Sequence, residues 1–288
     1  GLLLLQVDPN YFWRDDTQLY HLAGYAEAAR AWQEGEWPLL SQATWQGSAL
    51  AAEYLNGVFS IFLQICGCFV FGLGLPLPTA AATFALVHLA VLAMGAYRLA
   101  RQRGLAVEPA YLVALLASLN GYMFIWGTLW LPALTSFAWV PWAWWALERA
   151  LQSGGPLRFV PAGVFIYFVL SAGWPFSVLM LALVSGWLLV RPSEARRWPV
   201  FAAWAMGIGL SAPAWLMLLE YARTTVRGHV PLGHVSYGLQ VPVSALPGFV
   251  FPAFITSWSL FEGWKPHLSV ELAGGLVPIV ILLALKRR

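Results

Sequence analysis

Apolar stretches long enough, or nearly long enough, to cross a lipid bilayer recur along most of this chain and decide its fold class. Their ranges are 55–75, 79–97, 110–126, 130–148, 158–173, 175–190, 199–219 and 271–285. A straight helix needs about 20 apolar residues to cross the hydrocarbon core of a membrane. Only 10% of the residues are charged, against about 25% in soluble domains. We therefore predict an all-α fold, a polytopic transmembrane helical bundle in the cell inner (cytoplasmic) membrane.

Basic side chains gather at the ends of some of these stretches and predict their orientation. The four clusters are Arg98, Arg101 and Arg103; Arg149 and Arg158; Arg191, Arg196 and Arg197; and Lys286, Arg287 and Arg288. The turns between them, such as "SAGWPF" at 171–176, carry no charge, and this turn either joins two short helices or interrupts one. Because basic loops stay in the cytoplasm, the four clusters are expected there and the loop 221–270 outside.

An acidic head precedes the apolar stretches. Residues 1–53 hold seven acidic and two basic residues, whereas the remainder holds six acidic and fourteen basic ones. Within the head, "DDTQLYHLAGYAEAARAW" places apolar residues three and four apart, which predicts an amphipathic helix lying at the membrane surface. Asp16 or Thr17 is expected to cap its start, and Gly35 to end it. We expect an acidic, amphipathic extracytoplasmic first loop.

The number of apolar stretches leaves the side of this head open. Seven of them separate it from the loop 221–270. If all seven cross the membrane, the two loops face opposite sides. If one is re-entrant or lies flat, they share a side.

Several short motifs, in their shared order, resemble the YfhO-like branch of the bacterial GT-C-type membrane glycosyltransferases. The motifs are the acidic pair Asp15–Asp16, "GEWPLL" (35–40), "WQGSALA" (45–51), "WVPWAWWALERAL" (139–151), "SAGWPFSVL" (171–179), "LSAPAWLMLLEYARTTVRG" (210–228) and "ELAGGLVPIVILLAL" (271–285). The resemblance implies a GT-C-like bundle that transfers a sugar from a polyprenyl-phosphate donor to an extracytoplasmic or lipid acceptor. It also implies that the head and the loop 221–270 share the outer face, so that one stretch within 55–75 or 158–190 does not cross.

In that family the first outer loop carries an acidic residue or pair that acts as general base, as metal ligand, or as both. Asp15 and Asp16 stand at the matching place and are the candidate catalytic residues. Adjacent carboxylates disfavour joint ionisation, so one pKa should rise; a divalent cation, Mg or Mn, bridging Asp15 and Asp16 is the other expectation. The structural alternative is a helix cap followed by a solvated acid.

Four further residues are candidates for substrate binding. Arg223 and Arg227 lie one turn apart on a continued helix and would bind a phosphate together, or else anchor a helix end. His21 would join the acidic site or lie at the interface. Trp37 offers a ring on which an acceptor sugar would stack.

The expected organisation has five parts. Residues 1–7 are the tail of a preceding transmembrane helix, in a chain that we expect to be part of a longer one. They are followed by an extracytoplasmic loop with interfacial helices (8–53), the helical bundle (54–220), a second extracytoplasmic loop (221–270) and a final transmembrane helix (271–288). The expected partners are membrane lipids, the polyprenyl-phosphate sugar and other membrane subunits. Nucleic acid is not, because no basic run is interleaved with polar residues. The alternative function is a non-catalytic structural or assembly subunit of a larger membrane complex, built on a degenerate GT-C fold.

Overall fold

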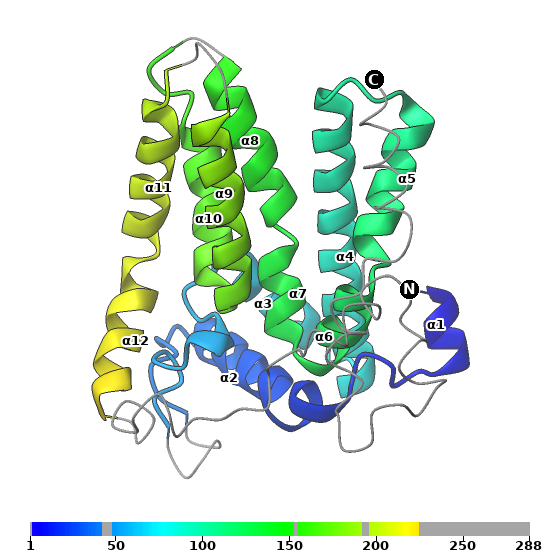
Figure 1. Cartoon of the computed structure of the whole chain (residues 1–288). Helices are drawn as coiled ribbons and strands as arrows, with labels where there is room; N and C mark the ends of the chain where they lie inside the picture. Colours follow the sequence, from blue (N-terminus) through cyan, green and yellow to red (C-terminus); the bar gives the residue numbers. More distant parts are fainter. Residues whose placement is uncertain (1, 42–47, 153–154, 192–195, 225–288) are drawn as a thin grey trace, which may run out of the picture.

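The regular structure of the chain is helical. The computed structural model describes residues 2–41, 48–152, 155–191 and 196–224. Within these ranges there is one isolated antiparallel bridge, between Ser41 and Ser48, but no strand. The predicted all-α class is therefore confirmed. The helices, shown in Figure 1, are α1 (Leu2–Val7), the π-helix η1 (Thr17–His21), α2 (Leu22–Gln33), the 3₁₀-helix η2 (Tyr54–Asn56), α3 (Ile61–Gly72), α4 (Leu77–Gln102), α5 (Val107–Ser118), α6 (Gly121–Leu129), α7 (Leu131–Phe137), α8 (Val140–Gln152), α9 (Val160–Ser171), α10 (Pro175–Val190), α11 (Trp198–Leu210) and α12 (Ala212–Thr224).

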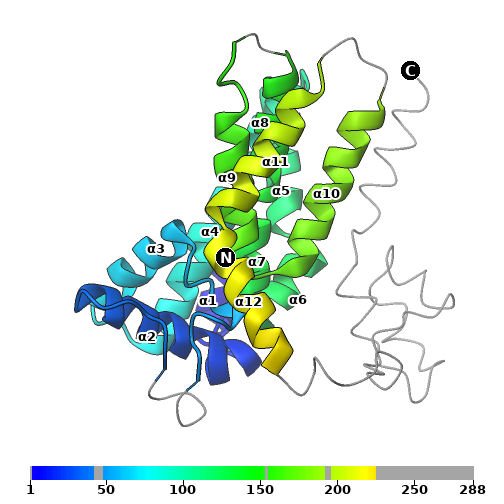
Figure 2. The ribbon, with the colours of Figure 1, turned by 90° about the vertical axis from the view of Figure 1, so that its left-hand side faces the viewer.

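The longer helices run side by side between two ends of the molecule (Figures 1 and 2). Helix α4 packs against α5 and α8, α8 packs against α9, and α9 packs against α11. Small residues allow these close approaches, as at Gly207 of α11, which faces Ile166 and the carbonyl of Gly163 on α9. A side chain at Gly207 would collide with Ile166, so this spacing depends on glycine.

The N-terminal part of the chain forms a separate layer at one end. Helix α3 packs against α2, and η1 contacts α7. Figure 2 shows α2 and α3 beside the lower ends of the long helices rather than among them. The apolar stretch 55–75 therefore contributes a 12-residue helix, α3, to this layer.

The two ends of the molecule differ in the charges that their turns carry. Helices α4, α8 and α10 all end at the upper end in Figure 1, where α5, α9 and α11 begin. Three of the four basic clusters fall on these connections, and the fourth, at 286–288, lies outside the described residues. The α2–α3 layer and the last turn of α12 lie at the opposite end (Figure 1). The acidic head and the exit of α12 thus share one end, because 55–75 does not run the length of the helical array.

Helix length singles out α4 among the apolar helices. Within the part of the chain that the structure describes, α4 alone is long and apolar enough to cross a membrane as one helix. Helices α11 and α12 meet the same criterion only together, and they are bent by 63° at their junction. Helices α3, α5, α9 and α10 are apolar but shorter than 18 residues. The predicted stretches 110–126 and 130–148 are each divided, into α5 and α6 and into α7 and α8.

The uncharged turn "SAGWPF" reverses the chain between α9 and α10, so the reading as two short helices is confirmed. Gly173 adopts φ +93°, and a Cβ built there would lie 2.4 Å from the carbonyl oxygen of Tyr54. The next residue, Trp174, is buried and donates a 2.6 Å hydrogen bond from Nε1 to the hydroxyl of Tyr122. The reversal is therefore packed tightly onto the N-terminal layer.

Candidate functional site

The stretch from Asp8 to Asp16 forms a tight turn between α1 and η1, which we call the acidic turn. The Asp8 carboxylate accepts a 3.0 Å hydrogen bond from the backbone N–H of Asn10 and forms an ion pair with Arg14. The guanidinium of Arg14 also lies 5.3 Å from the centre of the Tyr11 ring. Arg14 is thus occupied within the turn, by Asp8 rather than by the two acids that follow it.

Asp15 and Asp16 carry the free negative charge of this turn. Neither forms an ion pair with another described residue. Asp15 is exposed and has φ +46°, the one non-glycine residue with a positive φ in the described part of the chain. Aspartate tolerates this conformation better than most residues, at a cost on the order of 1 kcal/mol. Asp16 is half-buried, and burial followed by the charge of Asp15 raises the pKa of its carboxyl.

The helix that follows begins differently from our expectation. Asp16 has helical backbone angles and its side chain makes no capping hydrogen bond, so the predicted cap is wrong for Asp16. A capping residue needs extended backbone angles, which Asp16 lacks. Thr17 does not cap the helix either: its hydroxyl donates a 3.0 Å hydrogen bond to the carbonyl of Leu129 and accepts a 3.1 Å one from the N–H of Leu131. Thr17 therefore ties the acidic turn to the junction of α6 and α7.

His21 closes the π-helix and lies in the interior. Its side chain is only 2% exposed, and neither ring nitrogen has a hydrogen-bond partner among the described residues. The rings of Tyr20 and Trp130 lie 5.2 and 6.2 Å away between centres. Burial lowers the pKa of His21 to about 4, so the ring is neutral at pH 7. It does not lie at the surface, and as a neutral ring it cannot serve as the cation of a phosphate site.

Trp37 lies well away from the acidic turn. It is 67% exposed and packs edge-to-face against Trp32, with ring centres 4.9 Å apart. Helices η1 and α2 separate it from Asp16, and at about 1.5 Å per residue they span roughly 25 Å. The structure therefore does not bring Trp37 to Asp15 and Asp16.

Arg223 is exposed in the last turn of α12, and Arg227 lies outside the described residues. The preceding turn of α12 reaches the N-terminal layer, where Tyr221 forms a hydrogen bond with Glu53. Arg223 thus lies at the same end of the molecule as the acidic turn (Figure 1).

Glu53 joins the N-terminal layer to α12 and was not among the candidate residues predicted from the sequence. It is half-buried, and burial raises the pKa of its carboxyl while the Tyr221 hydroxyl opposes that shift. A shifted pKa at a junction of two distant segments is typical of functional sites. No local signal marks Glu53, because its environment depends on α12, far along the chain.

Among the described residues, no group of three or more His, Cys, Asp or Glu side chains is arranged to hold a metal ion. Two adjacent carboxylates fit Mg²⁺, which is commonly held by one or two carboxylates together with substrate phosphates.

Glu148 anchors the opposite, basic end of the molecule. Its side chain is 1% exposed and accepts a 2.8 Å hydrogen bond from Nε of Arg103; Arg191 lies 3.5 Å away. The neighbouring Arg149 is not among these partners and lies over the ring of Trp145. Residues adjacent on a helix point in different directions.

No protein-family model matches this chain, and neither the curated proteins nor the solved structures provide a match.

Proposed function

We propose that the chain is a multi-pass membrane protein with its acidic end outside and its basic end in the cytoplasm. The separation of the basic clusters from the acidic layer supports this orientation. The outer surface of the helices supports a lipid environment: on α10, Leu179, Leu183 and Val190 are 56, 66 and 79% exposed. Exposing this apolar surface to water costs free energy, whereas exposing it to lipid chains does not.

At its acidic end the chain is a GT-C-type inverting glycosyltransferase that moves a sugar from a polyprenyl phosphate to an extracytoplasmic or lipid acceptor. One observation carries this proposal: the acidic turn presents Asp15 and Asp16, free of ion pairs, at the end opposite the arginine clusters. A carboxylate with a raised pKa is better matched to accept a proton near neutral pH. Asp16 is therefore the general base. Asp15, its neighbour in the turn, contributes to the raised pKa of Asp16 through its negative charge.

The leaving phosphate needs positive charge as the glycosidic bond breaks. Arg223 lies at the same end as the acidic turn and supplies that charge, with Arg227 as its expected neighbour one turn further along. A divalent cation held by Asp15 and Asp16 would neutralise the phosphate in addition. Because no protein carboxylate attacks the sugar carbon in this scheme, the product has inverted stereochemistry.

The experiment measures sugar transfer from a polyprenyl-phosphate sugar by the purified chain in lipid vesicles. We expect Asp16→Asn to lower the rate by at least about 100-fold, in the range found for loss of a general base. Glu36→Gln is the matched control, because it removes an exposed carboxylate of the same layer, beyond the far end of α2. Equal transfer by the wild type, Asp15→Asn and Asp16→Asn would remove the acids from the mechanism.

A second candidate is a non-catalytic assembly subunit, which an exposed apolar stripe on α3 favours. Ile61, Ile65, Phe69 and Leu73 follow one another at four-residue steps and are 58 to 66% exposed. Such a stripe in the N-terminal layer would bury well against a neighbouring membrane subunit. Absence of transfer by the wild-type chain, with every tested donor, would favour this function over the enzyme.

A further inference from the structure

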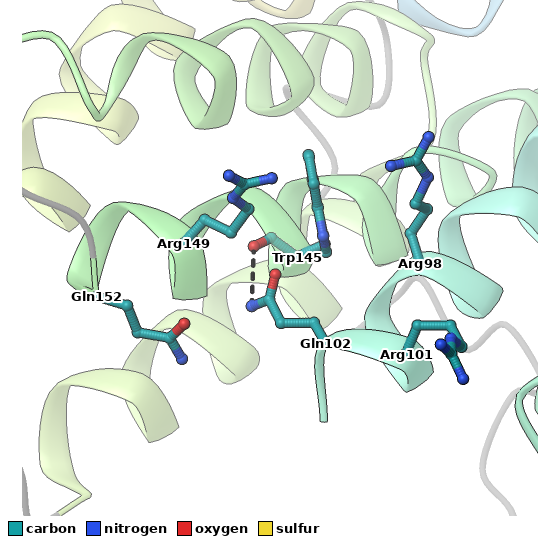
Figure 3. A pocket seen from close by; sticks show the side chains of 6 residues that line it. All are labelled: Arg98, Arg101, Gln102, Trp145, Arg149 and Gln152. Atoms are coloured by element: carbon teal, nitrogen blue, oxygen red, sulfur yellow. Dashed lines mark hydrogen bonds between the residues drawn. The ribbon is translucent and has the colours of Figure 1, made fainter. Parts of the chain in front are cut away.

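A pocket of about 400 Å³ opens at the basic end, between the last turns of α4 and α8 (Figure 3). Its lining is Arg98, Arg101 and Gln102 from α4 and Trp145, Arg149 and Gln152 from α8. Figure 3 shows Arg98 and Arg149 on either side of the Trp145 ring. The pocket lies at the other end of the molecule from the acidic turn and has no part in the transfer proposed above.

The lining carries three positive charges and no carboxylate. Glu148, the acid nearest in sequence, is buried and already paired with Arg103 and Arg191, neither of which lines the pocket. The three lining guanidiniums repel one another, and the nearest counter-charge is that of Glu148, whose Oε2 lies 3.4 Å from Nε2 of Gln102. An anion in the pocket would remove this repulsion.

Three of the lining side chains, those of Arg101, Gln102 and Arg149, make contacts within the protein. Arg149 lies 5.2 Å from the centre of the Trp145 ring, and Arg101 donates a 3.0 Å hydrogen bond to the carbonyl of Leu105. Nε2 of Gln102 donates to the carbonyl of Trp145 at 3.5 Å and to Oε2 of Glu148 at 3.4 Å, so its N–H groups are already used. Each arginine keeps further N–H groups, since a guanidinium has five. Their planar fork matches phosphate oxygens especially well.

We propose that this pocket binds a phosphate-bearing anion, of the size of a diphosphate or a phospholipid headgroup. The volume lies within the range of small-molecule sites and exceeds what one phosphate fills. The Trp145 ring forms an apolar wall, and the Gln152 amide supplies a neutral donor beside the three cations. Basic pockets between helices on the cytoplasmic side of membrane proteins commonly hold acidic lipid headgroups.

The surface next to the pocket favours a lipid as the source of this phosphate. Ala90, Met94 and Arg98 follow one another at four-residue steps on α4, and all three are exposed. This face is therefore apolar up to Met94 and basic from Arg98 onward. A phospholipid would place its headgroup at the arginines and its chains along the apolar part. The lipid source depends on the membrane location proposed above, whereas phosphate binding in the pocket does not.

The test titrates the purified full chain, in a neutral detergent, with three probes. They are short-chain phosphatidylglycerol, short-chain phosphatidylcholine and inorganic pyrophosphate. We expect binding of phosphatidylglycerol, and its weakening by at least about tenfold in the double variant Arg98→Gln/Arg149→Gln. The matched control is Arg196→Gln, an exposed arginine at the same end but outside the pocket, which should change the affinity by less than about twofold. Circular dichroism of each variant checks that the helices are retained.

The pattern of results decides between the sources. Binding of pyrophosphate but not of phosphatidylglycerol, with the same dependence on Arg98 and Arg149, would keep the phosphate site and assign it a soluble ligand. Equal weakening by Arg196→Gln, or binding of phosphatidylcholine as tight as that of phosphatidylglycerol, would overturn the proposal. So would failure of both anions to bind. These outcomes do not depend on sugar transfer, so the proposed activity and the pocket can fail separately.

Discussion

Nε of Arg103, just beyond the end of α4, donates a 2.8 Å hydrogen bond to Oε2 of Glu148 on α8. Trp144 adds a 3.1 Å hydrogen bond from its indole to Oε1 of the same carboxylate. Arg191, directly after α10, approaches it as well. One buried carboxylate thus holds the ends of three helices together.

Removing this carboxylate should destabilise the chain. Glu148→Ala leaves Arg103 and Arg191 without their common partner. We expect a loss of about 2 to 3 kcal/mol in the free energy of unfolding. This value is slightly below the usual cost of breaking a buried pair, because the two arginines are partly exposed. The control is Glu34→Ala, which removes an exposed pair with Arg30 and should cost less than about 0.5 kcal/mol. Denaturant unfolding in detergent, followed by tryptophan fluorescence, measures both. Equal losses would show that the buried pair contributes nothing special.

The raised pKa of Asp16 predicts a pH-dependent stability. The pKa of Asp16 is higher in the folded chain than in the unfolded chain, so protonation of Asp16 favours folding. This stabilisation is fully present below the unfolded pKa and is lost as the pH rises through the folded pKa. Asp16→Asn should therefore raise the melting temperature at pH 7 but not near pH 3, with a gain below about 1 kcal/mol since the group is only half-buried. Gln18→Asn, an exposed neutral change in η1, should shift both melting temperatures alike. A gain from Asp16→Asn that is the same at both pH values would contradict this account.

The chain reversal at Gly173 should tolerate no side chain. Gly173→Ala combines an unfavourable φ of +93° with a clash against the backbone of Tyr54, so we expect a loss of more than about 2 kcal/mol in the free energy of unfolding. Gly186→Ala, in the middle of α10 with open space around it, should instead stabilise by about 0.5 to 1 kcal/mol. Thermal unfolding of the two variants distinguishes the site-specific clash from a general intolerance of alanine.

The proposed orientation predicts opposite accessibility of the two ends. Starting from a chain with Cys66→Ala and Cys68→Ala, we would introduce Glu36→Cys at the acidic end or Arg196→Cys at the basic end. In sealed right-side-out vesicles, a membrane-impermeant maleimide should modify the first variant at once and the second only after permeabilisation. Immediate modification of both would contradict a membrane between the two ends.

The sequence predicted the two ends of the molecule better than it predicted the helices between them. Charge is costly inside a bilayer or a protein core, so clusters of basic residues indicate turns. The three clusters within the described residues could therefore be assigned to one end directly from the sequence. The breaks within 110–126 and 130–148 are harder to see, since the composition is equally apolar on both sides. One break did carry a local signal: Asn120 caps α6 by accepting a 3.0 Å hydrogen bond from the N–H of Met123.

The surroundings of the candidate residues depended on tertiary structure. The sequence offered Asp15 and Asp16 as a candidate acidic pair but did not predict that Asp8 would form the ion pair with Arg14. It placed His21 either at the acidic site or at the interface, whereas packing under Trp130 leaves the ring buried and without a hydrogen bond. Packing of this kind joins segments more than 100 residues apart, and no periodicity within one segment reports it.

The two hydrogen bonds of Thr17 link the residue directly after the acidic turn to the α6–α7 junction. Trp130 lies between the two bonded backbone groups, and its ring packs against Trp174 with centres 5.1 Å apart. A ligand that shifted the acidic turn would therefore act on this indole pair, of which Trp174 is buried and Trp130 half-buried. The chain has 17 tryptophans, so the part of any emission change that reports on this turn is the part that Trp130→Phe removes.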